Sequence, residues 1–245
     1  MIRALSFICL VILWQAASLL SEPRQLPGPI IVAQTIIGEA QSGALLTHLL
    51  ATTLRVCAAF LLAMSLGMPI GYMMGRIRTI DRLLDPWIVI HLNIPALVVI
   101  VLSYIWLGLT ETAAIGAVAL NKLPNVVITI REGARSLSQE LEELATIFNF
   151  SAINRLRHII IPQLGPYIAA TMRTGLSLVW KLVLIVELLG RSDGVGFQIN
   201  LAFQLFDMRL LLAYALPFIA LMLFIETALV QPFERRVSRW RNNDA

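Results

Sequence analysis

Long apolar runs alternate with short polar segments over most of the 245 residues of the chain. An apolar run of about 20 residues has the length that an α-helix needs to cross the hydrocarbon core of a bilayer. Six runs come close to that length, so the pattern predicts an all-α, polytopic membrane protein with about six transmembrane helices. The predicted crossings are Ile2–Leu20, Thr52–Met74, Pro86–Trp106, Thr112–Ile130, Gly165–Gly190 and Leu210–Val230.

The overall composition points the same way. Hydrophobic residues make up 58% of the chain, charged residues only 14%, and the mean hydropathy is +0.80. A soluble domain of this size is roughly half apolar and a quarter charged. The apolar excess indicates a lipid-facing surface and argues against a water-soluble enzyme. The net charge of +4 comes from arginines near apolar runs, which favours a role in membrane topology over nucleic-acid binding.

The first 50 residues are expected to hold the first transmembrane helix and an extracytoplasmic amphipathic segment. The opening run resembles a secretory signal, so cleavage near Ala17 stays an alternative to a retained span. A Pro/Gly cluster follows it and breaks the helix. The apolar residues expected on the amphipathic segment are Ile31, Ile36, Ile37, Leu45 and Leu46. Residues 51–245 are expected to form a core of five transmembrane helices.

The basic residues predict an orientation. With six crossings, three groups of arginines fall on the same side as Arg3, and the short turn "LGLTET" on the other side has no Lys or Arg. Because cytoplasmic loops are enriched in Lys and Arg, both termini are expected in the cytoplasm. The three groups are Arg76, Arg78 and Arg82; Arg131, Arg135, Arg155 and Arg157; and Arg235, Arg236, Arg239 and Arg241.

Three prolines lie inside predicted crossings, namely Pro95, Pro124 and Pro217. Each removes one backbone hydrogen bond, so neighbouring helices or water must satisfy the freed carbonyl group. Such breaks occur both in moving parts of transporters and in static, kinked helices. The sequence does not choose between these two interpretations.

Residues 131–164 are too charged to cross a bilayer and too periodic to form an irregular loop. Apolar residues recur at helical spacing from Leu137 through Leu141 and Leu144 to Phe148, with Glu140, Glu142 and Glu143 on the remainder of the surface. Ser151 can cap a second helix, which carries Ile153, Leu156, Ile159 and Ile160 and which Pro162 is expected to end. The segment is predicted to be a cytoplasmic helix–turn–helix. Its apolar edge can dock a partner or, alternatively, pack against lipid headgroups or the protein's own spans.

This segment resembles the EAA loop of ABC importer permeases, which reads Glu-Ala-Ala, three residues, Gly, nine residues, then Ile-x-Leu-Pro. The chain has Glu143-Leu144-Ala145, then Asn149, then Ile159-Ile160-Ile161-Pro162. Leu144 replaces the first alanine and Asn149 replaces the glycine; asparagine is the next-best residue for a left-handed bend. Further fragments resemble the nitrate, sulfonate and taurine branch of this family, including "GMPIGYMMGR", "IPALVVIVLSYIWLGL" and "GLSLVWKLVLIVELLGRSDGVGFQI".

The resemblance implies a type I ABC importer permease in the cell inner membrane, with no catalysis and no cofactor of its own. ATP and Mg²⁺ would bind a separate cytoplasmic ABC ATPase, since the sequence has no G-x-x-x-x-G-K-[ST] phosphate loop. The other implied partners are a periplasmic or lipid-anchored solute-binding protein and a second, identical permease copy. The residues implied in coupling to the ATPase are Glu143, Leu144, Ala145, Phe148, Asn149, Ile159 and Pro162.

Both lysines of the chain, Lys122 and Lys181, fall near the middle of a predicted crossing. A charge there costs at least about 2.5 kcal/mol on insertion scales and marks a functional site by default. One hypothesis places them on the translocation path of a small anion, together with Glu187. The alternative is a structural ion pair between a lysine and Glu187. Arg55 and Arg173 lie closer to span ends, where interfacial anchoring is expected.

The loop "GRSDGVGFQI", residues 190–199, is expected on the extracytoplasmic side. Asp193 and Gln198 are candidate contacts for an outer gate or a docked binding protein, and a flexible turn is the simpler alternative. The three histidines, His48, His91 and His158, are scattered along the sequence and predict no metal site. No Ser/His/Asp or HExxH set suggests a membrane-embedded enzyme.

Two questions stay open at this stage. A stand-alone secondary transporter is the rival function, although it would be expected to carry inverted repeats, and none is visible. The substrate also does not follow from the sequence. A sulfonate, taurine or nitrate anion fits the resemblance, and a vitamin precursor or another organic solute is the alternative.

Overall fold

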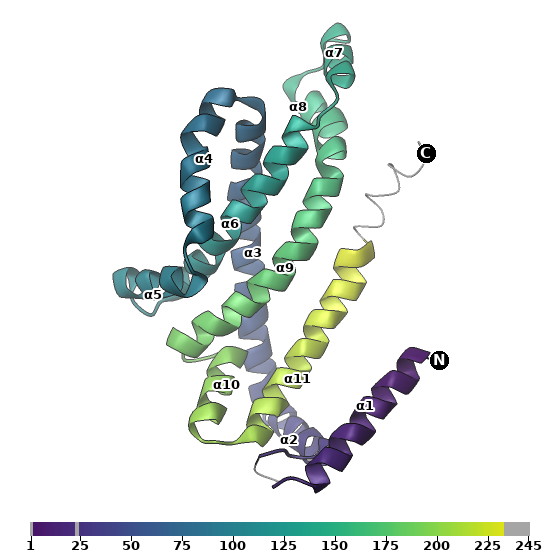
Figure 1. Cartoon of the computed structure of the whole chain (residues 1–245), viewed down its shortest axis with the longest axis vertical. Coiled ribbons are helices and arrows are strands. Elements are labelled where there is room, and N and C mark those ends of the chain that lie inside the picture. The colour runs from purple at the N-terminus through teal and green to yellow at the C-terminus, as the bar shows by residue number, and fades with distance from the viewer. Residues whose placement is uncertain (1, 23–24, 233–245) are drawn as a thin grey trace. The chain divides into compact units, whose positions relative to one another are not determined.

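A computed structural model describes residues 2–22 and 25–232, and these form eleven α-helices and two π-helical turns with no β-strand among them (Figure 1). Contacts divide the chain into two compact units, one comprising Met1–Arg55 and Val183–Leu223 and the other Val56–Leu182 and Phe224–Ala245. Three long helices contribute to both units. The sequence-based division into residues 1–50 and a five-helix core of residues 51–245 follows other boundaries than these two compact units, and it stays a prediction.

The first unit joins the N-terminal part of the chain to residues 183–223. Pro29 begins α2 at a position where its missing N–H is no loss, and Trp14 Nε1 of α1 donates to the carbonyl of Pro27 at 3.1 Å. Tyr214 of α11 donates to Glu39 of α2 at 2.6 Å. The helices of this unit are α1 (Ile2–Leu19), α2 (Pro29–Gln41), the start of α3 (Ala44–Arg76), the end of α9 (Ile161–Gly190), α10 (Val195–Gln204) and most of α11 (Met208–Ile225).

The second unit packs around α6 (Glu111–Arg135). Val126 and Ile130 of α6 contact Met64 of α3, and Val127 contacts Met74 of α3 and Ile88 of α4. The remaining elements of this unit are α4 (Arg78–Asn93), α5 (Ala96–Leu107), α7 (Gln139–Ile147), α8 (Ala152–Arg155), the π-turns η1 (Leu156–Ile160) and η2 (Glu226–Val230), and the adjoining parts of α3 and α9.

A stripe of glycines brings α3 and α6 close together. Gly67, Gly71 and Gly75 follow one another at four-residue spacing, and a Cβ added at any of them would lie 2.5–2.7 Å from atoms of α6. Small residues at this spacing let helix backbones approach closely in a membrane, where the hydrophobic effect gives little attraction between helices. The stripe is plain in the sequence as "GMPIGYMMG", but its packing role was not foreseen.

Every predicted crossing corresponds to helical structure, although not every helix is a simple span. By length and composition, three helices of the described residues could cross a membrane: Ala44–Arg76, Glu111–Arg135 and Met208–Ala228. In the first predicted crossing, Ile8–Leu19 forms a shorter apolar helix. The fifth, α9, has 30 residues and carries Arg173, Lys181 and Glu187.

The third predicted crossing, Pro86–Trp106, is wrong as a single straight helix. The chain breaks at Ile94 and Pro95, and α4 and α5 are bent by 97°. The residue before a proline disfavours the helical conformation, and Ile94 is accordingly extended (φ −79°, ψ 124°). Pro124 and Pro217, in contrast, lie inside α6 and α11.

The amphipathic segment predicted after the first crossing also needs correction. It is the helix α2, and its Val32 is fully buried. Leu45 and Leu46 do not belong to it, since α3 begins at Ala44, eight residues before the predicted Thr52. At about 1.5 Å per residue, the 33 residues of α3 are about 50 Å long, more than a bilayer core requires.

Candidate functional site

The predicted helix–turn–helix exists and lies at one end of the second unit, next to the end of α6 and the start of α9 (Figure 1). Ser138 caps α7 by accepting from the N–H of Leu141 at 3.4 Å. The N–H of Ser138 in turn donates to Gln163 of α9 at 2.8 Å. Leu137 packs with Ile160 of η1 and Leu164 of α9, so the first turn of the segment is fixed to the following helices.

Asn149 makes the bend between the two short helices. Its φ of +50° is in the left-handed region, which confirms the predicted bend. The N–H of Phe150 donates to the carbonyl of Ala145 at 2.9 Å, and that of Asn149 donates to Thr146 at 3.1 Å. These two bonds form a Schellman motif, which satisfies the last carbonyl groups of α7.

Ser151 caps α8, as predicted, by accepting from the N–H of Asn154 at 3.3 Å. Pro162, however, does not end the run. The chain stays helical from α8 through η1 into α9, and Pro162 lies in the first turn of α9. A π-helical turn shifts the hydrogen-bond ladder. η1 ends at Ile160, two residues before the proline, and the helix accommodates the ring and the missing N–H in the first turn of α9 without ending.

The apolar stripe predicted on this segment divides into a buried part and an exposed part. Leu137 is buried, whereas Leu144 and Phe148 are exposed, Phe148 by 69%. We call the exposed apolar residues around the bend the elbow patch; its members are Leu144, Ile147, Phe148, Phe150 and Ile153. Nothing in the second unit covers this patch within the described residues.

The inner side of the elbow is held by charge and by small residues. Glu142, which was expected on the exposed face, is buried and forms ion pairs with Arg76 of α3, at 3.1 Å, and with Arg155 of α8. Ala145 and Ile159, two of the residues implied in coupling, are also buried. They support the elbow from within. Glu143 is exposed and accepts a hydrogen bond from Gln139 at 3.1 Å.

Lys122 lies inside the second unit, and only 2% of its surface is exposed. A Cβ at Gly175 of α9 would come within 2.6 Å of its Cε and 3.0 Å of its Nζ, so the lysine side chain lies against the backbone of α9. Across residues 2–22 and 25–232, no hydrogen bond or ion pair of this ammonium group is found. A buried cation without a counter-charge is unusual, because burial disfavours charge unless a partner compensates it.

Lys181 differs from Lys122. It is exposed, and its Nζ lies 5.5 Å from the centre of the Trp180 ring, in the geometry of a cation–π contact. Neither lysine pairs with Glu187 in the structure. The lysine–glutamate ion pair considered from the sequence is therefore absent from the described chain.

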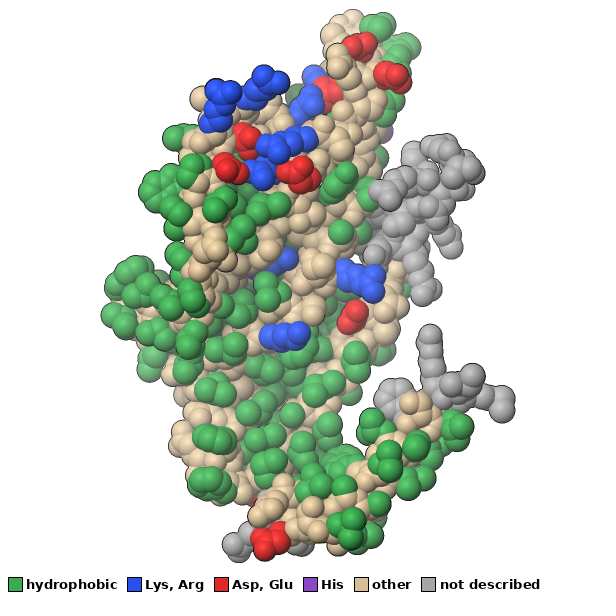
Figure 2. All heavy atoms as spheres, viewed as in Figure 1, with side chains coloured by type: hydrophobic (Ala, Val, Ile, Leu, Met, Phe, Trp, Pro, Cys, Tyr) green, Lys and Arg blue, Asp and Glu red, His purple; other side chains and the backbone are tan. Residues whose placement is uncertain are grey.

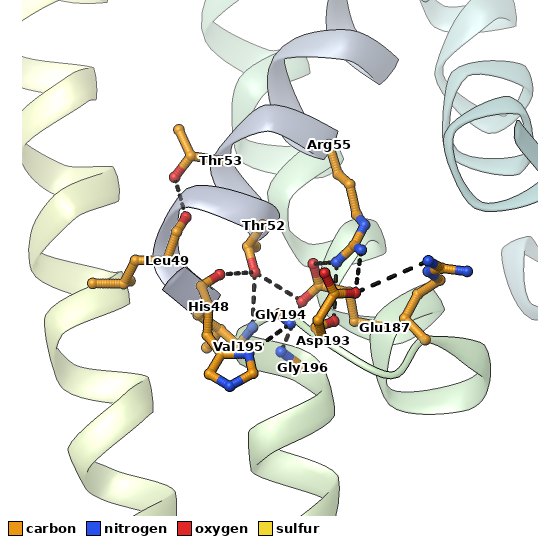
Figure 3. Close-up of polar contacts among 11 residues, drawn as sticks. His48, Leu49, Thr52, Thr53, Arg55, Glu187, Asp193, Gly194, Val195 and Gly196 are labelled. Carbon is orange, nitrogen blue, oxygen red and sulfur yellow. Dashed lines mark hydrogen bonds and ion pairs between the residues drawn. The ribbon is translucent and has the colours of Figure 1, made fainter. Parts of the chain in front are cut away.

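Glu187 pairs instead with Arg55 (Figure 3). The Glu187 carboxylate is completely buried and accepts from Arg55 at 2.7 Å, from Thr52 at 2.9 Å and from the N–H of Gly196 at 2.8 Å. Arg55 also donates to Asp193, to its side chain at 2.5 Å and to its carbonyl at 3.0 Å. Arg55 is only 4% exposed, so its expected role as an interfacial anchor is wrong.

The loop after α9 wraps around this carboxylate. Gly194 has a φ of +104°, and a Cβ there would lie 2.3 Å from the Glu187 side chain, so only glycine fits. The N–H of Gly194 donates to Nδ1 of His48 at 3.0 Å, which requires Nδ1 to be unprotonated and places the proton of a neutral ring on Nε2. That nitrogen lies 2.7 Å from Nε2 of Gln198. Two N–H groups cannot bond to each other, so the Gln198 amide is assigned with its oxygen turned toward the ring as the acceptor.

We call this set the Glu187 network; its members are His48, Thr52, Arg55, Glu187, Asp193, Gly194, Val195, Gly196 and Gln198. Sequence reasoning found Glu187, Asp193 and Gln198 but missed His48, Thr52 and Arg55 on α3. One available signal was the presence of Arg55 within an otherwise apolar run.

Comparison with known proteins decides the family. Residues 67–239, well over half of the chain, match the sequence profile described as "Binding-protein-dependent transport system inner membrane component". The chain belongs to this family. The matched part contains the elbow, Lys122 and the loop of the Glu187 network.

Curated relatives of the permease support the same conclusion. It is 30% identical over 218 residues to a permease named for aliphatic sulfonates, SsuC of Bacillus subtilis, covering 89% of the chain and 79% of the relative. Identity is 28% with the taurine transport permease TauC of Escherichia coli (95% and 86% covered) and 30% with the riboflavin transport permease RibX of Chloroflexus aurantiacus (96% and 88%). The resemblance to ABC importer permeases is thereby confirmed.

The fold of the permease has a solved counterpart. The crystal structure of an amino acid ABC transporter with histidines contains a chain of the same fold, with a TM-score of 0.64 and 21% identity, covering 80% of the permease and 95% of that chain. The predicted all-helical permease fold is confirmed. The family description also makes the protein an inner membrane component of a transport system that depends on a binding protein.

Proposed function

We propose that the elbow patch of this ABC importer permease docks into a groove on a separate cytoplasmic ATPase, and that two identical copies form the pore. The observation that carries the proposal is the exposed apolar surface of Leu144, Ile147, Phe148, Phe150 and Ile153 around one rigid bend. A short helix with exposed apolar anchors fits the helix-in-groove mode of recognition. ATP and Mg²⁺ would then bind the ATPase and not this chain.

The connections of the elbow support a role in transmitting movement. Glu142 links it to α3 through Arg76, and Leu137 links it to α9 through Ile160 and Leu164. A displacement of the elbow would therefore act on two long helices at once. Packed helices of this kind move as stiff bodies, which is the usual mechanical basis of domain-scale switching.

The orientation we propose places the elbow and both chain termini in the cytoplasm. Arginines of α3, α4, α6 and α8 gather in the second unit near the elbow, with acidic side chains among them (Figure 2). This clustering fits the enrichment of basic residues in cytoplasmic segments. The side chain of Arg3 and the arginines of residues 235–241, which the sequence also places on this side, lie outside the described part of the chain.

For the solute, we propose a small anion, such as a sulfonate, taurine or nitrate. The support is the unpaired ammonium group of Lys122, together with relatives named for sulfonate and taurine transport. Lys181 would contribute only where a second copy covers its exposed side. Glu187, first grouped with these lysines, has its carboxylate fully occupied, so we assign it to holding the extracytoplasmic loop.

A neutral or larger organic solute is the second candidate, favoured by the riboflavin permease among the relatives. On the extracytoplasmic side we propose that Asp193 and Gln198 lie near the docked binding protein. The Asp193 side chain is 42% exposed, although Arg55 holds it in place.

The test is to purify the tagged permease and to ask which proteins accompany it. We expect an ATPase whose hydrolysis rises when a loaded binding protein is added, and uptake of the solute that this binding protein captures. Uptake by the purified chain alone, driven by an ion gradient, would establish the stand-alone secondary transporter instead.

A further inference from the structure

A second charged feature lies apart from the elbow, the Glu187 network and Lys122. It is a hollow of about 480 Å³ in the second unit, formed between the end of α3, the start of α4 and the end of α6. Four arginines line it and only one acidic residue does: Arg76, Arg78, Arg82, Arg135 and Asp81. We refer to it as the arginine hollow.

The charges of the arginine hollow are not balanced. Asp81 accepts from Arg135 at 2.6 Å and also pairs with Arg131 at 3.3 Å, so its carboxylate is already engaged. Arg76 is compensated by Glu142. Arg78 and Arg82 are exposed and form no ion pair with any residue of the described ranges. Two guanidinium groups are thus left without a counter-charge beside one hollow.

The backbone adds to this positive potential. α4 has 16 residues and begins at Arg78, and its N-cap residue, Ile77, provides no side-chain cap. The first N–H groups of a helix are unsatisfied and carry a partial positive charge, which favours an anion there. A guanidinium group can donate two parallel hydrogen bonds to phosphate oxygens. A phosphate between two arginines can therefore accept such a pair from each of them.

Apolar side chains are also exposed close to the unpaired arginines, in addition to Asp85 and Glu132, which pair with Arg131 and Arg135. Ile77 and Leu83, each next to one of the unpaired arginines, are exposed, as is Trp87 one turn beyond Leu83. Tryptophan side chains are enriched at the level of the lipid headgroups. A ligand with an anionic head and apolar chains therefore matches both halves of this surface.

We propose that the arginine hollow binds the phosphate of an anionic phospholipid headgroup, with its acyl chains along Leu83 and Trp87. Arg78 and Arg82 supply the charge that the protein leaves unmatched, and basic pockets between membrane helices suit such headgroups. The same phosphate chemistry could come from soluble phosphate, so the experiment separates the two sources. The proposal does not rest on the solute or on the docking of the ATPase.

The test uses the full-length permease in nanodiscs of mixed phosphatidylglycerol and phosphatidylcholine, with native mass spectrometry counting the lipids retained after release. We expect retained phosphatidylglycerol to fall by at least about tenfold in Arg78→Gln/Arg82→Gln, because two arginines then stop contributing to headgroup attraction. Arg157→Gln, an exposed arginine outside the hollow, is the matched control and should keep its lipid. Both arginines are exposed, so single variants and Arg→Lys substitutions remain available if the double variant folds poorly.

A parallel arm titrates inorganic phosphate into the lipid-free permease in a zwitterionic detergent. Binding of inorganic phosphate that depends on Arg78 and Arg82, without selective retention of phosphatidylglycerol, would support the phosphate site but contradict the lipid as its source. Equal retention of both lipids by wild type and variant, with no phosphate binding, would overturn the proposal. So would loss of the co-purifying ATPase in the variant with lipid retention unchanged, because the arginines would then serve that protein.

Discussion

The Glu187 network and Lys122 are two ways of placing charge inside a membrane protein. Glu187 is completely buried, yet it receives hydrogen bonds from Arg55, Thr52 and the backbone of Gly196. Lys122 is almost as deeply buried, and no described residue compensates its ammonium group. We interpret the network as stabilising the chain itself, and we predict that Lys122 serves a ligand or partner outside the single chain.

The elbow shows the same contrast, between groups that are covered within the chain and groups that are not, for apolar side chains. Leu137 is buried within the second unit, whereas the elbow patch, a few residues later on the same helix and bend, stays exposed. An exposed apolar patch beside a rigid bend indicates a binding surface when it lies outside the lipid. We interpret charged and apolar groups that find partners within the chain as stabilising the fold. We interpret the unpaired charge of Lys122 and the exposed elbow patch as contact sites for a ligand or partner.

The largest effect is expected from breaking the network. Glu187→Leu removes one of the two carboxylates that pair with buried Arg55, and removing one partner of a buried pair typically costs about 3–5 kcal/mol. We expect little folded permease in the membrane, as measured by size-exclusion yield and thermal unfolding. The double variant Arg55→Met/Glu187→Leu should recover part of the yield, because it removes both charges together. Full wild-type stability of the single variant would contradict the assignment.

Disrupting the elbow patch should spare folding and abolish assembly. Phe148→Asp places a charge where we expect an apolar groove on the ATPase. Loss of a central anchor costs about 2 kcal/mol or more, so co-purified ATPase should fall at least about tenfold. Asn154→Asp is the matched control, since it adds the same charge on exposed α8 without altering the patch. Equal ATPase yield from both variants would remove the docking role.

Lys122 offers the sharpest test of the contrast, because stability and function should move in opposite directions. Lys122→Met keeps most of the volume but removes an uncompensated buried charge, so the midpoint of thermal unfolding should rise. Anion uptake in proteoliposomes should fall by about tenfold, an increase of about 1.4 kcal/mol in the barrier. Lys181→Gln removes an exposed charge and should lower uptake less. If uptake by Lys122→Met matches wild type, the lysine is not on the path.

The smallest effect is expected at the bend of the elbow. Asn149→Ala forces alanine into a left-handed conformation, at a cost of about 1–2 kcal/mol, whereas Asn149→Gly removes that cost. We expect a modest fall in binding-protein-stimulated ATP hydrolysis for the alanine variant and recovery with glycine. Identical loss in both variants would indicate that the asparagine side chain itself contacts the partner.

Sequence periodicity and composition were enough to predict the helical membrane fold and the elbow, whereas the left-handed bend at Asn149 was predicted from the resemblance to the EAA loop. The family resemblance was carried by motifs spread over most of the chain, and the comparisons confirmed it. Local rules failed where neighbouring structure decides the outcome. Pro162 continues a helix because a π-turn precedes it, and Glu142 is buried because Arg76 and Arg155 reach it.

The partners of buried charges could not be predicted from the sequence, for a related reason. Thr52 and Arg55 bind Glu187 although they lie more than 130 residues before it in the sequence, and no local pattern records that pairing. An apolar run with a single arginine fits an interfacial anchor as well as a buried ion pair. The roles of Lys122, Lys181, Asp193 and Gln198 in transport stay predictions.

The most direct test of the coupling account is site-specific photo-crosslinking in the assembled importer. A photoreactive residue in place of Phe148 should form an adduct with the ATPase subunit, while the same residue in place of buried Leu137 should form none. Adducts of the Phe148 position with lipid alone, or labelling of that position from outside the cell, would contradict the account.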